Sequence, residues 1–293
     1  MINESVIQQH YEELAKFRYT HAETERNAMR GKNLTMITSD SVHIAFDDEG
    51  NGLPIVLLHG YGCRRGHWEY QREALLEAGY RVVAVDLRGH GESDTPKHGQ
   101  TLARLGQDVR ELLEQLDLHD VTLVGHSMGV CVALAMFTVS GFDRITRFVS
   151  VDQSPKIIND EEWSWGVKNV TWKNVDDCVH WRFKWSNEEL EPALPAGSAM
   201  GEEPWEKFDH QAVIKLFVDH FVADWRDTLP RLPMPTWVVT SRFTNYYHLE
   251  GMEWFANEVP DGRLSVFEHS GHNPHVSEAS EFNRCLLEFL GDN

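Results

Sequence analysis

The chain has 293 residues, and its 46 acidic and 27 basic side chains give a formal net charge of −19 at pH 7. A chain of this length can bury one large core as a single domain with an insertion. The negative charge disfavours nucleic acid and anionic membranes as partners, and no apolar run approaches the roughly 20 residues that span a bilayer. Because the N-terminus is polar and lacks the pattern of a signal peptide, and because the four cysteines are scattered, we expect a cytoplasmic protein with free thiols.

Residues 1–30 are expected to form a polar helical extension, since apolar side chains recur there at near-helical spacing. Further along, short apolar runs alternate with segments of helical periodicity. Helices are predicted at 101–115, at 128–137 and over the last residues. Strands are predicted at 35–38, 42–46, 54–60, 81–86, 121–127, 147–152, 236–240 and 263–268. This alternation predicts an α/β fold with a mostly parallel central sheet flanked by helices on both faces.

The segment 153–230 interrupts the alternation and carries seven of the ten tryptophans. Because it stands between two predicted core strands, we expect a helical cap over the carboxyl ends of the sheet, where open α/β sheets bind ligands. The core then comprises residues 31–152 and 231–293. Most of the tryptophans are expected to join the cap to the core, and Trp163 and Trp185 are the candidates for lining a substrate pocket.

The pentapeptide GHSMG, from Gly125 to Gly129, follows a predicted strand and opens a predicted helix. In that context the pattern G-x-S-x-G is typical of a nucleophile elbow, a strained turn that exposes the serine oxygen and tolerates only small neighbours. The N-terminus of the following helix favours developing negative charge. Ser127 is therefore the candidate nucleophile.

Six motifs occur in a fixed order along the chain. They are LLHGYG (57–62), DLRGHGESD (86–94), GHSMG (125–129), SVDQSP (150–155), MPTWVVT (234–240) and HSGHNPH (269–275). With these motifs the chain resembles the α/β-hydrolase superfamily over nearly all of residues 35–290, which implies the α/β-hydrolase fold. One departure is Val130, where many members carry a further glycine.

The resemblance implies catalytic roles for several residues of these motifs. His272 matches the catalytic histidine, which takes the proton of Ser127 and later returns it to the leaving group. The backbone N–H groups of Tyr61 and Met128 match the two donors of the oxyanion hole, which stabilise the tetrahedral intermediate.

Substrate contacts are expected beside these groups. His59, Gly60 and His126 flank the candidate nucleophile and the oxyanion donors in the sequence motifs. For His59 the backbone position is expected to matter more than the imidazole. We add Trp163 and Trp185 of the insertion to this set.

The acidic member of the triad departs from the commonest family position. Most members carry it after the strand that corresponds to residues 236–240, where this chain has Thr244 and no acid before Glu250. A minority place it at the end of the preceding strand, and there this chain has Asp152. We therefore predict that Asp152 orients His272, with Glu250 as the fallback.

The spacing of His269, His272 and His275 raises the question of a metal site. We disfavour this interpretation because no Cys or Glu completes the set of ligands. The expectation is an enzyme without a metal and without another cofactor.

The resemblance implies hydrolysis of a small apolar or aromatic ester, lactone or related acyl compound through an acyl-enzyme. Haloalkane dehalogenases and epoxide hydrolases of this fold are disfavoured, because they need an aspartate where Ser127 stands. Cofactor-independent dioxygenases of 3-hydroxy-4-quinolones remain an alternative, in which a His–Asp dyad is the base, although Met128 replaces the histidine expected in that family. C–C bond hydrolases and hydroxynitrile lyases share the scaffold as well, whereas a ligand-binding receptor would need a broken triad.

The expected partner is a small-molecule substrate. The N-terminal helix could pack on the body of the protein or on a second subunit, so a homodimer stays open.

Overall fold

The computed structural model describes residues 30–180, 194–195, 198 and 208–291. The predicted extension at the N-terminus lies outside these residues, apart from its last one, Arg30. Within the described residues, no helix combines the length and the apolar character that crossing a membrane requires.

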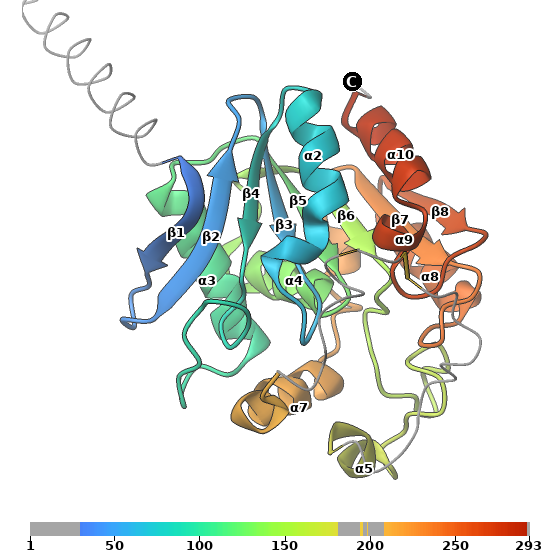
Figure 1. The fold of residues 1–293 in the computed structure, drawn as a ribbon. Helices are drawn as coiled ribbons and strands as arrows, with labels where there is room; N and C mark the ends of the chain where they lie inside the picture. Colours follow the sequence, from blue (N-terminus) through green and yellow to red (C-terminus); the bar gives the residue numbers. More distant parts are fainter. Residues whose placement is uncertain (1–29, 181–193, 196–197, 199–207, 292–293) are drawn as a thin grey trace, which may run out of the picture.

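Among the described residues, eight strands form one sheet in the order β1-β2-β4-β3-β5-β6-β7-β8 (Figure 1). β2 is antiparallel to both of its neighbours, β1 and β4, and the other neighbours in the sheet are parallel. The mostly parallel sheet predicted from the sequence is thus confirmed. The strands are β1 (Gly31–Ile37), β2 (His43–Glu49), β3 (Pro54–Leu58), β4 (Arg81–Val85), β5 (Val121–His126), β6 (Ile145–Val151), β7 (Thr236–Ser241) and β8 (Gly262–Phe267).

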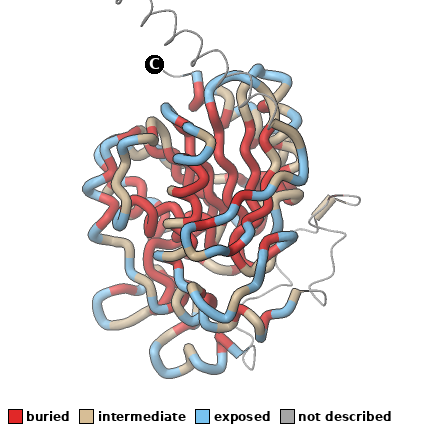
Figure 2. The backbone as a smooth tube through the Cα atoms, turned by 90° about the vertical axis from the view of Figure 1, so that its left-hand side faces the viewer, coloured by how far each residue is buried: buried red, intermediate tan, exposed pale blue. Residues whose placement is uncertain are grey.

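The inner strands of the sheet are buried on both faces, whereas the edge strands β1 and β8 are partly exposed. Alternate side chains of a strand point to opposite faces, so Val56 and Leu58 of β3 join one core cluster while Ile55 and Leu57 join the other. Helices α3, α4 and α8 contribute to the first cluster, and α2 and α10 to the second, so that the strands form the buried centre visible in Figure 2. The helices of the core are α2 (Glu69–Glu77), α3 (Leu102–Gln115), α4 (Met128–Ser140), α8 (Leu249–Glu258), α9 (Pro274–Ser277) and α10 (Ala279–Gly291).

The insertion between β6 and β7 is only partly helical in its described residues. Figure 1 shows α5 and α7 beyond the ends at which the parallel strands finish, the place expected for a ligand-binding region. The division into a core and a cap at 153–230 remains a prediction. The short helices of the insertion are α5 (Val175–Val179), η4 (His210–Val213), α7 (Ile214–Val222) and η5 (Leu229–Arg231).

Helices α3 and α4 approach each other closely at Gly106. A Cβ atom at this position would lie 2.6 Å from the backbone nitrogen of Met136, closer than real side chains come. The glycine therefore sets the separation of α3 from α4. Because α4 begins directly after Ser127, this packing also fixes the helix that carries the candidate nucleophile.

We expect Gly106→Ala to lower the free energy of unfolding, measured by urea denaturation. Alanine has the better helix propensity by about 1 kcal/mol, but overpacking between two fixed helices typically costs about 1–3 kcal/mol. Gly291→Ala, at the end of α10, is the matched control because its Cβ would meet open space. A variant at Gly106 as stable as the wild type would contradict the close approach.

Candidate active site

Ser127 occupies a sharp turn between β5 and α4. Its backbone has φ 51° and ψ −124°, and a positive φ is rare and strained outside glycine. A Cβ atom on Gly125 would lie 2.6 Å from the backbone nitrogen of Val130. A Cβ atom on Gly129 would lie 2.3 Å from the carbonyl oxygen of Leu58. Both glycines of the G-x-S-x-G pattern are therefore required by the packing of this turn.

A hydrogen bond joins His272 to Asp152. Nδ1 of His272 lies 2.7 Å from Oδ2 of Asp152. The side chain of Asp152, directly after β6, is fully buried, whereas His272, in the segment between β8 and α9, keeps 13% of its side chain exposed. Because an ionised carboxylate only accepts, Nδ1 carries the proton of this bond and the lone pair of the ring stands on Nε2. A general base in a triad requires this tautomer.

Two threonines hold the same carboxylate. Oγ1 of Thr240 donates to Oδ1 of Asp152 at 2.8 Å, and Oγ1 of Thr244 donates to Oδ2 at 2.6 Å. These bonds offset the cost of burying a carboxylate, which is on the order of several kcal/mol. Thr244, the position at which the resemblance led us to expect an acid, thus donates a hydrogen bond to Asp152, the acid predicted at the end of the neighbouring strand. Glu250, the fallback, is exposed in the first turn of α8.

His126 connects the turn of Ser127 to the segment between β8 and α9 that carries His272, here called the His272 loop. Its Nε2 lies 3.0 Å from the carbonyl oxygen of His272, and the two ring centroids are 4.7 Å apart. On the other side, a Cβ atom on Gly60 would lie 3.1 Å from both Nδ1 of His126 and Cβ of Ser127. Burial is the main cause that lowers the pKa of His126 well below its ordinary value, and the nearby His275 is the second cause. The ring is therefore neutral, and its Nε2–H donates to the carbonyl oxygen of His272. The contact observed for His126 is with the backbone of His272.

His59 holds the turn that follows β3. Its Nδ1–H donates to the carbonyl oxygen of Gly60 at 2.7 Å, and the N–H of Leu87 donates to its Nε2 at 3.0 Å. Both ring nitrogens are thus engaged by the backbone, and burial lowers the pKa of His59. The two residues predicted to be oxyanion donors lie at this turn and at the turn of Ser127, and their role stays a prediction. Tyr61 comes next in the turn, and Met128 is the first residue of α4, where an N–H has no acceptor within its own helix.

Of the two tryptophans predicted to line a pocket, Trp185 lies outside the described residues. Trp163 is buried, and its indole N–H donates to the carbonyl oxygen of Lys156 at 3.0 Å. Its ring packs edge-on against Trp165 and Trp254, with centroids 5.4 and 4.9 Å away. These contacts join the insertion to α8, and a role of Trp163 in binding substrate stays a prediction.

The three histidines after β8 occupy different environments. His269 is exposed, whereas His275 is only 1% exposed and its ring lies 4.5 Å from that of Trp68. Burial lowers the pKa of His275 to about 3. In the part of the chain that the structure describes, no group of three or more His, Cys, Asp or Glu side chains is arranged to hold a metal ion.

Two neighbours of His272 were not found from the sequence. The ring centroid of Tyr246 lies 4.3 Å from that of His272. The sequence feature that could have indicated this neighbour is the pair Tyr246–Tyr247, which follows Thr244 after one residue. His220 of α7 is buried, and among the described residues its Nδ1 has no hydrogen-bond partner. Burial, followed by the electrostatic effect of the nearby His272, lowers the pKa of His220 to about 3.

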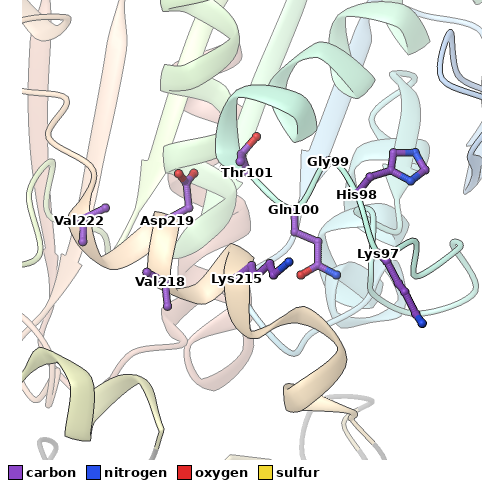
Figure 3. Close-up of a pocket in the computed structure, with 9 residues that line it drawn as sticks. All are labelled: Lys97, His98, Gly99, Gln100, Thr101, Lys215, Val218, Asp219 and Val222. Carbon is purple, nitrogen blue, oxygen red and sulfur yellow. The ribbon is translucent and has the colours of Figure 1, made fainter.

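A surface cavity of about 400 Å³ lies between α7 and residues 97–101 (Figure 3). Asp219 lines it and accepts a hydrogen bond at 2.7 Å from the backbone N–H of Leu102, at the start of α3. Neither Ser127 nor His272 lines this cavity, so we do not assign the substrate to it.

Comparisons with known proteins identify the family of the chain. A model of the alpha/beta hydrolase family matches residues 55–284. A non-heme chloroperoxidase from Kitasatospora aureofaciens is 30% identical over 268 aligned residues, covering 86% of this chain and 98% of that protein. An esterase from Exiguobacterium antarcticum has a TM-score of 0.80 at 26% identity, covering 89% of this chain and all (100%) of that one. For a bromoperoxidase from Bacillus anthracis the TM-score is 0.74 at 26% identity, covering 88% and 100%. The chain therefore belongs to the α/β-hydrolase family and is a hydrolase of that family.

Proposed function

We propose that the protein is a serine esterase that cleaves small apolar or aromatic esters or lactones through an acyl-enzyme. The observation that carries the proposal is the 2.7 Å hydrogen bond from His272 to the buried Asp152, in the site that also contains the turn of Ser127. A serine hydroxyl is a weak nucleophile until a neighbouring base accepts its proton. The His272–Asp152 pair supplies that base and the group that orients it.

In the proposed first half-reaction, Nε2 of His272 takes the proton of Ser127 as Oγ bonds to the carbonyl carbon of the substrate. The negative oxygen of the tetrahedral intermediate is stabilised by the backbone N–H groups of Tyr61 and Met128. Each such donor typically contributes about 3–4 kcal/mol. The imidazolium then gives its proton to the leaving alcohol, and the acyl group remains on Ser127. Asp152 stabilises the imidazolium without taking its proton.

In the second half-reaction, His272 removes a proton from water, and the hydroxide oxygen bonds to the acyl carbon. The tetrahedral intermediate collapses, Oγ of Ser127 leaves with the proton from His272, and the carboxylic acid is released. The ring of Tyr246 packs against His272. An aromatic side chain beside the base is our argument for an apolar or aromatic group in the substrate. Further support for ester chemistry comes from the similarity to the esterase from Exiguobacterium antarcticum.

A second candidate is peroxide-dependent oxidation of halide, because the relative from Kitasatospora aureofaciens is a non-heme chloroperoxidase. Hydrogen peroxide is a nucleophile that can attack the acyl-enzyme in place of water. His272 takes one proton from the peroxide as the peroxide oxygen bonds to the acyl carbon, and Oγ of Ser127 leaves with that proton. The peroxyacid released oxidises bromide or chloride to the hypohalous acid and is itself reduced to the carboxylic acid. Bromination of monochlorodimedone in the presence of acetate, bromide and hydrogen peroxide tests this candidate, and Ser127→Ala should abolish the bromination.

We expect a fluorophosphonate probe to label the wild type at Ser127, and Ser127→Ala to remain unlabelled. Turnover of p-nitrophenyl esters should fall by about a million-fold in Ser127→Ala, because a triad fails as a unit. Ser140→Ala, at the other end of α4, is the matched control and should keep both labelling and turnover. Labelling that persists in Ser127→Ala would falsify the proposal. Oxygen uptake with a 3-hydroxy-4-quinolone that survives in this variant would favour the dioxygenase alternative.

Asp152→Asn should preserve the melting temperature to within a few degrees but lower turnover by up to about ten-thousand-fold. The amide lets His272 carry its proton on Nε2, which is the wrong tautomer for a base. Glu250→Gln should leave turnover unchanged, because Glu250 is exposed on α8. The reverse pattern, with activity lost only in Glu250→Gln, would show that the acid has been assigned to the wrong strand.

Thr244→Asp in the Asp152→Asn background provides a second test of the acid. The hydroxyl of Thr244 lies 2.6 Å from the carboxylate of Asp152, so a carboxylate at 244 would stand beside the same histidine. We expect partial recovery of turnover in the double variant. Equal turnover in the single and double variants would mean that the two strand ends are not interchangeable.

A further inference from the structure

Tyr61 lies in the turn that follows β3, here called the oxyanion turn, and its side chain contacts the insertion. Its hydroxyl donates to Nδ1 of His210 at 2.7 Å, and its ring stacks on Phe217 of α7 with centroids 4.1 Å apart and planes 24° from parallel. The ring of Phe208 meets Tyr61 edge-on at 5.1 Å. Tyr61 is 8% exposed, so this packing is inside the protein. The insertion thus holds the side chain of Tyr61, a residue of the turn after β3, by a hydrogen bond and by ring packing.

His210 extends the contact further into the insertion. Its Nε2 lies 2.9 Å from the carbonyl oxygen of Val179, at the end of α5. Since a carbonyl only accepts, Nε2 carries the ring proton, and Nδ1 is left to accept from the hydroxyl of Tyr61. Burial lowers the pKa of His210, which keeps the ring in this neutral form. One chain of hydrogen bonds therefore runs from Tyr61 through His210 to α5.

The core holds the same turn from the other side. The His59 ring fixes the carbonyl of Gly60, and the N–H of Cys63 donates to that same carbonyl at 3.1 Å. The peptide unit between Gly60 and Tyr61 includes the N–H that serves as the proposed oxyanion donor. Its carbonyl end is thus held by core groups, and the side chain that follows it is held by the insertion.

We propose that His210 is a positioning residue, which acts through the Tyr61 side chain to hold the Tyr61 N–H toward the oxyanion. The inference rests on the proposed function, because it assigns a geometric control to the oxyanion hole of that reaction. An oxyanion donor acts mainly in the transition state, and displacement by about 1 Å can cost about a hundredfold in rate. Loosening the chain of hydrogen bonds should therefore reduce binding of the tetrahedral state while leaving binding of the ester nearly unchanged.

The test compares Tyr61→Phe, His210→Leu and the double variant, with p-nitrophenyl butyrate as substrate and phenylboronic acid as inhibitor. Boron accepts Oγ of Ser127 while the serine proton moves to His272, and no group leaves, so the adduct is a tetrahedral anion with oxygens available to the hole. Tyr61→Phe keeps the ring that stacks on Phe217 and removes only the hydroxyl.

We expect each single variant to lose about tenfold in kcat and in affinity for phenylboronic acid, with KM changed by less than about threefold. The double variant should lose no more than the worse single one, because both substitutions break one chain of hydrogen bonds. Unchanged kcat and inhibitor affinity in the single variants would overturn the proposal. A fall in kcat with inhibitor affinity intact, or multiplied losses in the double variant, would also overturn it.

Two further variants separate positioning from general loss of stability. Asn159→Ala removes side-chain hydrogen bonds to the carbonyls of Val167 and Val170, within the insertion and apart from the oxyanion turn. It should lower the melting temperature without changing the ratio of inhibitor affinity to KM. His210→Asn returns an acceptor oxygen near the place of Nδ1 and should recover part of the loss seen in His210→Leu. Equal losses in the Asn and Leu variants would speak for packing alone and against the proposal.

Failure of the positioning role and failure of the proposed esterase function give different results. If the fluorophosphonate probe does not label Ser127 in the wild type, the esterase proposal itself fails. If Ser127 is labelled and esters are hydrolysed while the variants at Tyr61 and His210 keep wild-type values, only the positioning role is refuted.

Discussion

The hydrogen bond between Asp152 and His272 is the contact on which the rest of the site depends. A fully buried carboxylate would be unstable without donors, and here three groups supply them: His272 and the hydroxyls of Thr240 and Thr244. The same bond fixes the tautomer of His272 and the direction of its ring. His126 then ties the backbone of His272 to the end of β5, directly before Ser127. The proposed nucleophile and base are thereby held by backbone and side-chain contacts of the core.

The pairing of β6 with β7 explains how the proposed acid, Asp152, can stand at the end of the earlier strand. The strands are parallel and Val151 is opposite Val239, so Asp152 and Thr240 are neighbours just beyond the last pair. A carboxylate at either strand end can therefore point toward the same His272 loop. The strand end at which the resemblance led us to expect an acid still contributes, since Thr244 donates to Asp152. One strand keeps the negative charge, and the other supplies the hydroxyls that make its burial tolerable.

Local patterns predicted the sheet, and they failed where tertiary contacts decide. The buried parallel strands and the turn of Ser127 follow from short apolar runs and two glycines, because these features are set by neighbours in sequence. Helix α2 was not predicted, since few of its residues are apolar and the helical period is weak. Asp152 was predicted because this chain has Thr244 at the position where most members of the α/β-hydrolase family carry the acid. The sequence around Asp152 itself did not indicate the role. Its threonine donors depend on strand pairing, which no local pattern reveals.

The predicted substrate contacts show the same limit from another side. His59 and His126 stand beside the predicted oxyanion donor and the candidate nucleophile in the sequence motifs, yet they bond to the backbone. His59 bonds to Gly60 and Leu87 through its two ring nitrogens, and His126 bonds to His272 through Nε2. These two side chains thus hold the backbone around the proposed nucleophile and base. The side chain of Tyr61 instead leaves the core and bonds to His210 of the insertion. Under the proposed mechanism, a segment far along the chain thus positions a donor for the transition state, while the proposed triad stays anchored to the core sheet.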